Sequence, residues 1–117
     1  MQDPDDTFSF VADNQAKGLS TSPAITLNAN NAFSLQYWDY PPDEIHTMLI
    51  ERAKPWLGRA NIVESQVKRW RFATPASIWP DRCWHTEQLV LAGDAFGGPK
   101  VEGAALSGLA AAKALSE

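Results

Sequence analysis

The sequence predicts an α+β fold with a mostly antiparallel β-sheet, one amphipathic helix and a C-terminal helix of small residues. Three patterns lead to this prediction: apolar residues alternate over short segments, they recur at helical spacing over residues 41–58, and small residues fill 101–115. The resulting order of strand, hairpin, helix, long strand, loop, strand and helix is typical of an α+β fold. With 117 residues, 44% of them hydrophobic, we expect a single domain, 1–117, with a real core.

The N-terminal third of the chain has the alternation of β-strands. FSFVAD, residues 8–13, predicts a strand in which Phe8, Phe10 and Ala12 share one side. AITLNANNAFSLQYW, residues 24–38, predicts a hairpin with Asn30-Asn31 as its turn, because asparagine tolerates the positive φ of tight turns. One face of the first strand would carry Ile25, Leu27 and Ala29. One face of the returning strand would carry Phe33, Leu35 and Tyr37.

The middle of the chain predicts a helix and then a long strand. Residues 41–58 begin with two prolines followed by two acidic residues, which suit a helix N-terminus. Pro55 predicts a kink or a stop in the last turn, with Gly58 as terminator. Residues 61–74 alternate as a strand, and 75–87 form an irregular connection with two prolines. The apolar face of the helix comprises Ile45, Met48, Leu49, Ala53 and Trp56.

The last segment combines a short strand, a Gly-Asp turn and a helix that lacks bulky side chains. QLVLA, residues 88–92, predicts a buried strand, and Gly93-Asp94 follows it directly. In the helix, residues 103, 107 and 111 form one small-residue face, and residues 104, 108 and 112 form a second. Such faces allow another backbone or a flat ligand to come close, and a helix start offers unpaired N–H groups to a polar acceptor. The alternative is a tightly packed terminal helix in which the acid caps a turn.

Composition excludes several classes of protein. A net charge of −4 argues against nucleic-acid partners, and no apolar run has the length of a membrane span. The acidic N-terminus differs from a signal peptide, so we expect a cytoplasmic protein. A single cysteine, Cys83, excludes a disulfide framework, and neither His46 nor His85 has the partner spacing of a metal ligand. No metal site is therefore predicted.

Several spaced blocks resemble a known family. LVLAGDAFGGPKVEGAALSGLAAAKAL, residues 89–115, looks like the C-terminal flavin-binding segment of the flavin-containing amine oxidase superfamily. FVADNQAKG, ITLNANNAFS, VKRWRFATP and GDAFGG…VEGAALSG follow one another as in the C-terminal part of renalase-like oxidoreductases. The resemblance covers nearly the whole chain. It implies a substrate-domain sheet over residues 8–87, and the last strand–turn–helix of an FAD-binding domain over residues 88–117.

The resemblance also implies cofactor contacts at the C-terminal turn and helix. Gly93 would form the turn, and Asp94 would accept hydrogen bonds from the ribityl chain of FAD. The helix start would face the pyrimidine edge of the isoalloxazine, where reduced flavin carries negative charge. The residues implied at that helix start are Val101, Glu102, Gly103 and Ala104.

One part of the family pattern does not occur in this sequence. The G-x-G-x-x-G motif that holds the FAD pyrophosphate is absent, and Gly97-Gly98-Pro99 does not replace it. We therefore expect the C-terminal portion of an FAD-dependent oxidoreductase, without the N-terminal dinucleotide-binding part, that binds FAD weakly or not at all alone. In the complete enzyme, hydride would pass from a reduced nicotinamide-type or amine substrate to the flavin.

Substrate contacts and a second function follow from other residues. Trp70, Arg71 and Tyr37 are candidates to line a substrate cavity, although packing in a sheet or contact with water explains each of them as well. No Ser-His-Asp set or carboxylate pair marks a catalytic residue. The alternative function is a non-catalytic module that associates with itself as a dimer, or with another chain, through the strand at 89–92 and the small-residue helix.

Overall fold

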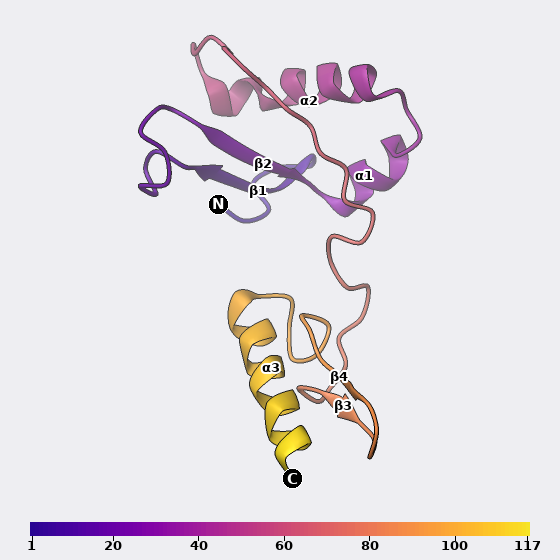
Figure 1. Ribbon diagram of the computed structural model, residues 1–117. Coiled ribbons are helices and arrows are strands. Elements are labelled where there is room, and N and C mark those ends of the chain that lie inside the picture. The colour runs from indigo at the N-terminus through magenta and orange to yellow at the C-terminus, as the bar shows by residue number, and fades with distance from the viewer. The chain divides into compact units, whose positions relative to one another are not determined.

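The computed structural model describes residues 1–117 and confirms the α+β class (Figure 1). Instead of one mostly antiparallel sheet, it contains two separate two-stranded antiparallel sheets. No helix is long and apolar enough to cross a bilayer. In chain order the elements are β1 (Phe8–Asp13), β2 (Ile25–Ala29), α1 (Asn31–Tyr37), α2 (Pro42–Leu57), β3 (Trp84–His85), β4 (Val90–Leu91) and α3 (Val101–Ser116).

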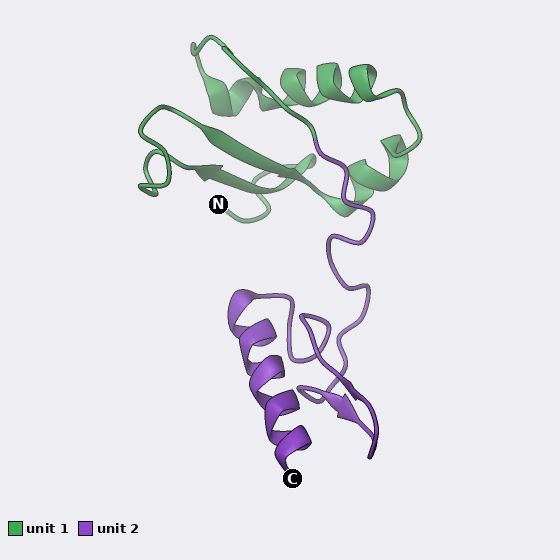
Figure 2. Cartoon of the chain, viewed as in Figure 1, with its two compact units in different colours: residues 1–67 green, residues 68–117 purple.

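The chain divides into two compact units, Met1–Val67 and Lys68–Glu117 (Figure 2). Unit 1 contains β1, β2, α1 and α2, and unit 2 contains β3, β4 and α3. Their boundary lies inside the segment that the sequence predicts as one long strand, and not between residues 87 and 88. The predicted single domain of 1–117 stays a prediction.

The first two predicted strands are confirmed in unit 1. β1 pairs with β2 in antiparallel register from Asp13 opposite Ile25 to Phe8 opposite Ala29, with an irregularity between Phe8 and Phe10. The irregularity breaks the strict alternation of β1, so that Phe8 is buried while Phe10 is only half-buried. The N-terminal residues extend this sheet, because the amide of Val11 donates to the carbonyl of Met1 at 3.0 Å.

The returning hairpin strand over Phe33–Tyr37 is wrong, since these residues form helix α1. Asn30 does not sit in a hairpin turn but caps the helix: its side chain accepts a hydrogen bond from the amide of Phe33 at 2.8 Å. The rings of Phe33 and Tyr37, four residues apart, then lie in contact with centroids 4.7 Å apart. Alternating aromatic residues over so short a segment are compatible with a strand or with a helix. The cap by Asn30 stabilises the helix.

Helix α2 confirms the amphipathic prediction. Pro42 is its first residue, Asp43 and Glu44 occupy the first turn, and Gly58 with φ of 60° ends it. Of the two alternatives predicted at Pro55, the stop is wrong, because the helix continues through Pro55 to Leu57, and the kink stays a prediction.

The core of unit 1 lies where α1 and α2 meet the β1–β2 sheet. A polar cluster beside this core joins the turn before β1 to α2, with Arg52 Nη1 donating to Thr7 Oγ1 at 2.9 Å and Trp56 Nε1 donating to Asp5 Oδ2 at 3.0 Å. The buried apolar side chains are Phe8, Ala12, Phe33, Ile45 and Ala53.

The long strand predicted over residues 61–74 is absent. The segment contains no helix or strand, and each of its residues is exposed, Val63 at 98% and Phe72 at 93%. Ser65 of this segment forms a hydrogen bond of 2.8 Å through its Oγ with His46 Nε2 on α2. Alternation alone does not make a strand, which also needs a partner for its backbone.

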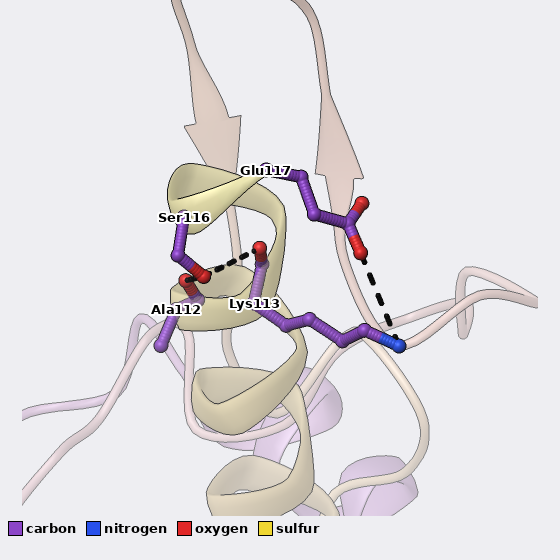
Figure 3. Close-up of polar contacts among 4 residues, drawn as sticks. All are labelled: Ala112, Lys113, Ser116 and Glu117. Atoms are coloured by element: carbon purple, nitrogen blue, oxygen red, sulfur yellow. Dashed lines mark hydrogen bonds and ion pairs between the residues drawn. The ribbon is translucent and has the colours of Figure 1, made fainter.

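Unit 2 places α3 beside the β3–β4 pair (Figure 1). The strand predicted over 88–92 is shorter than expected, Val90–Leu91, and it is not buried, since Leu91 is exposed. The helix predicted over 101–115 is confirmed as α3. At the end of α3, the Ser116 hydroxyl donates to the carbonyls of Ala112 and Lys113, and Lys113 Nζ lies 4.0 Å from a carboxylate oxygen of Glu117 (Figure 3). Of these contacts, the hydrogen bond to the carbonyl of Lys113 gives a donor to one of the last four carbonyls of the helix.

Candidate functional site

The candidate site is the corner of unit 2 where the turn after β4 meets α3. Gly93, Gly97 and Gly98 have φ values of 152°, 96° and 126°, a region that other residues seldom occupy. The amide of Phe96 donates to the carbonyl of Gly93 at 3.0 Å and closes the turn. Asp94 lies on this turn with its side chain exposed.

One small-residue face of α3 packs against this turn. Ser107 is fully buried, and its hydroxyl accepts a hydrogen bond from the amide of Gly93 at 2.9 Å. Gly103 is buried against the carbonyl of Gly98, and a Cβ at position 103 would overlap that oxygen. The chain's own packing therefore explains why residues 103 and 107 are small.

The second small-residue face of α3 is exposed. It comprises Ala104, Gly108 and Ala112. A Cβ added at Gly108 would meet no atom within 4 Å. Nothing inside unit 2 requires a glycine there, although glycine in a helix costs about 1 kcal/mol relative to alanine. This is the face that another backbone or a flat molecule can approach closely.

The start of α3 presents backbone donors. Lys100 is the N-cap with extended φ and ψ of −134° and 159°, and no side chain caps the helix. The first amide to reach a helical carbonyl is that of Ala104, which donates to the carbonyl of Lys100 at 2.9 Å. The preceding amides, 101 to 103, have no partner within the helix and suit an anionic or polar acceptor.

An open depression of about 410 Å³ lies at this helix start. Two cationic side chains and one acidic side chain border it, so its local charge favours an anion. Its lining includes Arg82, Gly97, Gly98, Lys100, Glu102 and Gly103.

The structure brings two of the predicted cofactor residues together at this depression. Glu102 and Gly103 line the depression, whereas Gly93, Asp94, Val101 and Ala104 do not. Gly93 is connected to the helix through Ser107, and Asp94 and Val101 face solvent.

None of the predicted substrate residues lines this depression. Trp70 is 71% exposed, and both Trp70 and Arg71 belong to the irregular segment 61–74. Tyr37 belongs to unit 1, where its ring packs edge-on against Tyr40 with centroids 5.1 Å apart. In unit 1, Tyr37 therefore has a packing role.

Other reactive side chains form no catalytic set. Cys83 is a free, half-buried thiol beside His85 in an open depression of about 360 Å³ that Asp81 and Arg82 also line. No group of three or more His, Cys, Asp or Glu residues could hold a metal ion.

Sequence reasoning missed the roles of Ser107, Gly98 and Arg82. The one available signal was the spacing of Gly103 and Ser107, which places both on a single helix face. That spacing does not distinguish a face packed against its own chain from a face that meets a ligand. The position of the turn 93–98 determines which face is covered, and the spacing does not reveal that position.

Comparisons with known proteins assign no family to this chain: no family model, no curated protein and no solved structure matches it.

Proposed function

We propose that this chain forms the isoalloxazine side of an FAD-dependent, renalase-like oxidoreductase, which a dinucleotide-binding polypeptide completes. One observation carries the proposal: an uncapped helix start, a glycine-rich turn and an open depression with two cationic side chains meet at a single corner. A cytoplasmic location is part of the same proposal.

The groups at this corner fit the chemistry of a reduced flavin ring. Reduced flavin carries negative charge near N1 and the C2 carbonyl, and the amides of residues 101 to 103 are donors for such an edge. Arg82 and Lys100 add positive charge at the depression. Glu102 would contribute its backbone amide, because its own carboxylate disfavours an anion.

Two further features of unit 2 support the same assignment. The exposed carboxylate of Asp94 can accept hydrogen bonds from ribityl hydroxyls. The exposed face of Ala104, Gly108 and Ala112 has no side chain that would keep a flat ring from the backbone.

In this proposal the residues of the chain bind and orient, and no side chain is assigned a proton-transfer step. When bound, FAD would supply hydride acceptance from a reduced nicotinamide-type or amine substrate. The substrate contacts expected from the sequence, Trp70, Arg71 and Tyr37, stay predictions. The chain alone would be inactive, since it has no G-x-G-x-x-G loop to hold the pyrophosphate.

Flavin fluorescence tests this proposal. We expect the chain to quench FAD fluorescence only when a dinucleotide-binding polypeptide with a G-x-G-x-x-G loop is added. Asp94→Ala should weaken the quenching by about tenfold, as expected for the loss of a hydrogen bond to a charged group. Asp81→Ala is the matched control, because Asp81 is also an exposed acid of unit 2. No quenching in any mixture, or equal losses in both variants, would count against the proposal.

A second candidate is a non-catalytic module that associates with itself. The observation that favours it is the exposure of large apolar side chains on unit 2, including Leu109 at 67% and Leu115 at 74%. Light scattering at increasing concentration should then show a dimer that Leu109→Ser with Leu115→Ser dissociates. A monomer at all concentrations contradicts this candidate.

A further inference from the structure

One serine of unit 1 is hydrogen-bonded to a histidine. The Oγ of Ser65 lies 2.8 Å from Nε2 of His46 on α2, and both residues belong to unit 1. Ser65 is exposed and lies in a stretch without helix or strand. Its hydroxyl oxygen is therefore accessible to a small molecule that arrives from solvent.

The histidine gives this hydroxyl a partner that can take up its proton. In the tautomer that carries its proton on Nδ1, the imidazole accepts the hydroxyl hydrogen at Nε2. The distance of 2.8 Å is within the reach that a general base requires. When the oxygen bonds to an electrophile and the imidazole removes the proton, a weak nucleophile becomes an activated one.

Other serine hydroxyls of the chain have different partners. Ser116 is exposed as well, but it donates to the carbonyls of Ala112 and Lys113. The hydroxyl of Ser20 donates to the carbonyl of Ser22 at 2.7 Å. A backbone carbonyl accepts a hydrogen bond but does not act as a base at neutral pH. These serines should therefore react more slowly than Ser65.

The pair lacks two parts of a site that turns over rapidly. No carboxylate is hydrogen-bonded to Nδ1 of His46, so no acid orients the imidazole. Ser65 is also not at a helix start, where backbone amides would converge on an oxyanion. The arrangement therefore favours a single reaction per chain over rapid turnover.

We propose that Ser65 is a site of covalent acylation by activated acyl donors, which are esters or thioesters with a good leaving group, and that His46 is its general base. The Oγ of Ser65 attacks the carbonyl carbon, and the new C–O bond forms as the hydroxyl proton passes to Nε2 of His46. The bond from the carbonyl carbon to the leaving group breaks, and the leaving group departs with the bonding electron pair. The imidazolium then releases its proton to the leaving group or to water. The inference does not depend on the proposed flavin chemistry, since it concerns a contact inside unit 1.

Incubation of the full chain with p-nitrophenyl acetate tests the proposal, with mass spectrometry of its peptides to locate and quantify the acetyl groups. General-base catalysis contributes about 10²–10⁴-fold when the base is well positioned. Because no third group orients His46, we expect Ser65 to be acetylated at least about tenfold faster than Ser116. His46→Gln should remove this advantage. The matched control His85→Gln removes an imidazole from unit 2 and should keep it.

Ser65→Ala distinguishes acylation of the serine from direct attack of the imidazole on the ester. It should lose the part of the p-nitrophenolate release that requires His46. If His46→Gln lowers the release and Ser65→Ala does not, the imidazole is itself the nucleophile and the proposal fails.

Equal acetylation of Ser65 and Ser116, or an unchanged rate at Ser65 in His46→Gln, also contradicts the proposal. Amide exchange in α2 shows whether His46→Gln keeps its fold. The comparison of Ser65 with Ser116 within the wild-type chain decides the matter without any variant.

Discussion

The two units of this chain bury different kinds of residue. In unit 1 the buried apolar side chains come from β1, α1 and α2, and Phe8 is only 1% exposed. In unit 2 the buried residues are Gly103 and Ser107, both on α3. The large apolar side chains of unit 2, such as Trp70 and Leu109, are instead mostly exposed.

This difference indicates two sources of stability. Unit 1 depends on removing apolar surface from water, so it should be sensitive to the loss of side-chain volume. Unit 2 depends on a close fit between the turn 93–98 and one face of α3, so it should be sensitive to an added atom.

Phe8→Ala should have the largest effect. Truncating a buried phenylalanine costs about 3–5 kcal/mol, which is a large part of the stability of a small unit. Hydrogen exchange should show lost protection in β1 and β2, with α3 unchanged. Phe72→Ala is the control, because Phe72 is 93% exposed in unit 2. Equal effects of the two substitutions would remove the distinction between the units.

Gly103→Ala should destabilise unit 2 by about 2 kcal/mol, within the range for overpacking a close contact. The new Cβ would overlap the carbonyl of Gly98, so the turn or the helix must move. Helix propensity alone predicts the opposite sign, since alanine is the better helix former by about 1 kcal/mol. Faster amide exchange in α3, with β1 and β2 unchanged, is the expected result. Slower exchange would show that the turn gives way at little cost.

Acid should weaken unit 1 through Asp5. The pKa of this carboxyl is lowered from its ordinary 3.8, mainly because the amide of Phe8 donates to it. The amide of Thr7, the Trp56 indole and the charge of Arg52 act in the same direction, whereas desolvation opposes them. Because the pKa is lower in the folded state, the stabilisation is complete above the unfolded pKa and is lost as the pH falls through the folded value.

NMR titration of the Trp56 indole chemical shift measures the protonation of Asp5 that causes this loss. Asp5→Asn keeps an acceptor for the two amides but carries no charge, so the signal should no longer follow the pH in this range. A wild-type titration at or above the ordinary aspartate pKa would contradict the proposed hydrogen-bonded cluster.

The parts of the fold that could be predicted from sequence are those that local chemistry decides. Two prolines and two acids at the start of α2, together with the spacing of its apolar residues, identify that helix. The strand β1 and the long helix α3 follow from alternation and from helix-forming composition. In each case the local preferences agree with the final structure.

The errors have two physical causes, a strand without a partner and a helix cap that the alternation conceals. Residues 61–74 alternate as a strand, but a strand forms only with a neighbour for its hydrogen bonds. Residues 31–37 alternate as well, and there the cap by Asn30 forms a helix instead. At the candidate site the sequence identified both small-residue faces of α3, but not which one the turn 93–98 would cover.

Gly108→Ala sharpens the contrast within α3 itself, because it makes the same change as Gly103→Ala on the opposite kind of face. No atom of the chain lies within 4 Å of the added Cβ. Helix propensity then acts alone and should stabilise unit 2 by about 1 kcal/mol. Slower amide exchange in α3 is the expected result. A destabilising effect would mean that the face around Gly108 is already packed against something in solution, such as a second copy of the chain.

Combined with the flavin titration, Gly108→Leu adds a direct test of the proposed cofactor face. A bulkier side chain should leave the isolated chain folded but reduce FAD quenching in the completed mixture, because the ring could no longer approach the backbone.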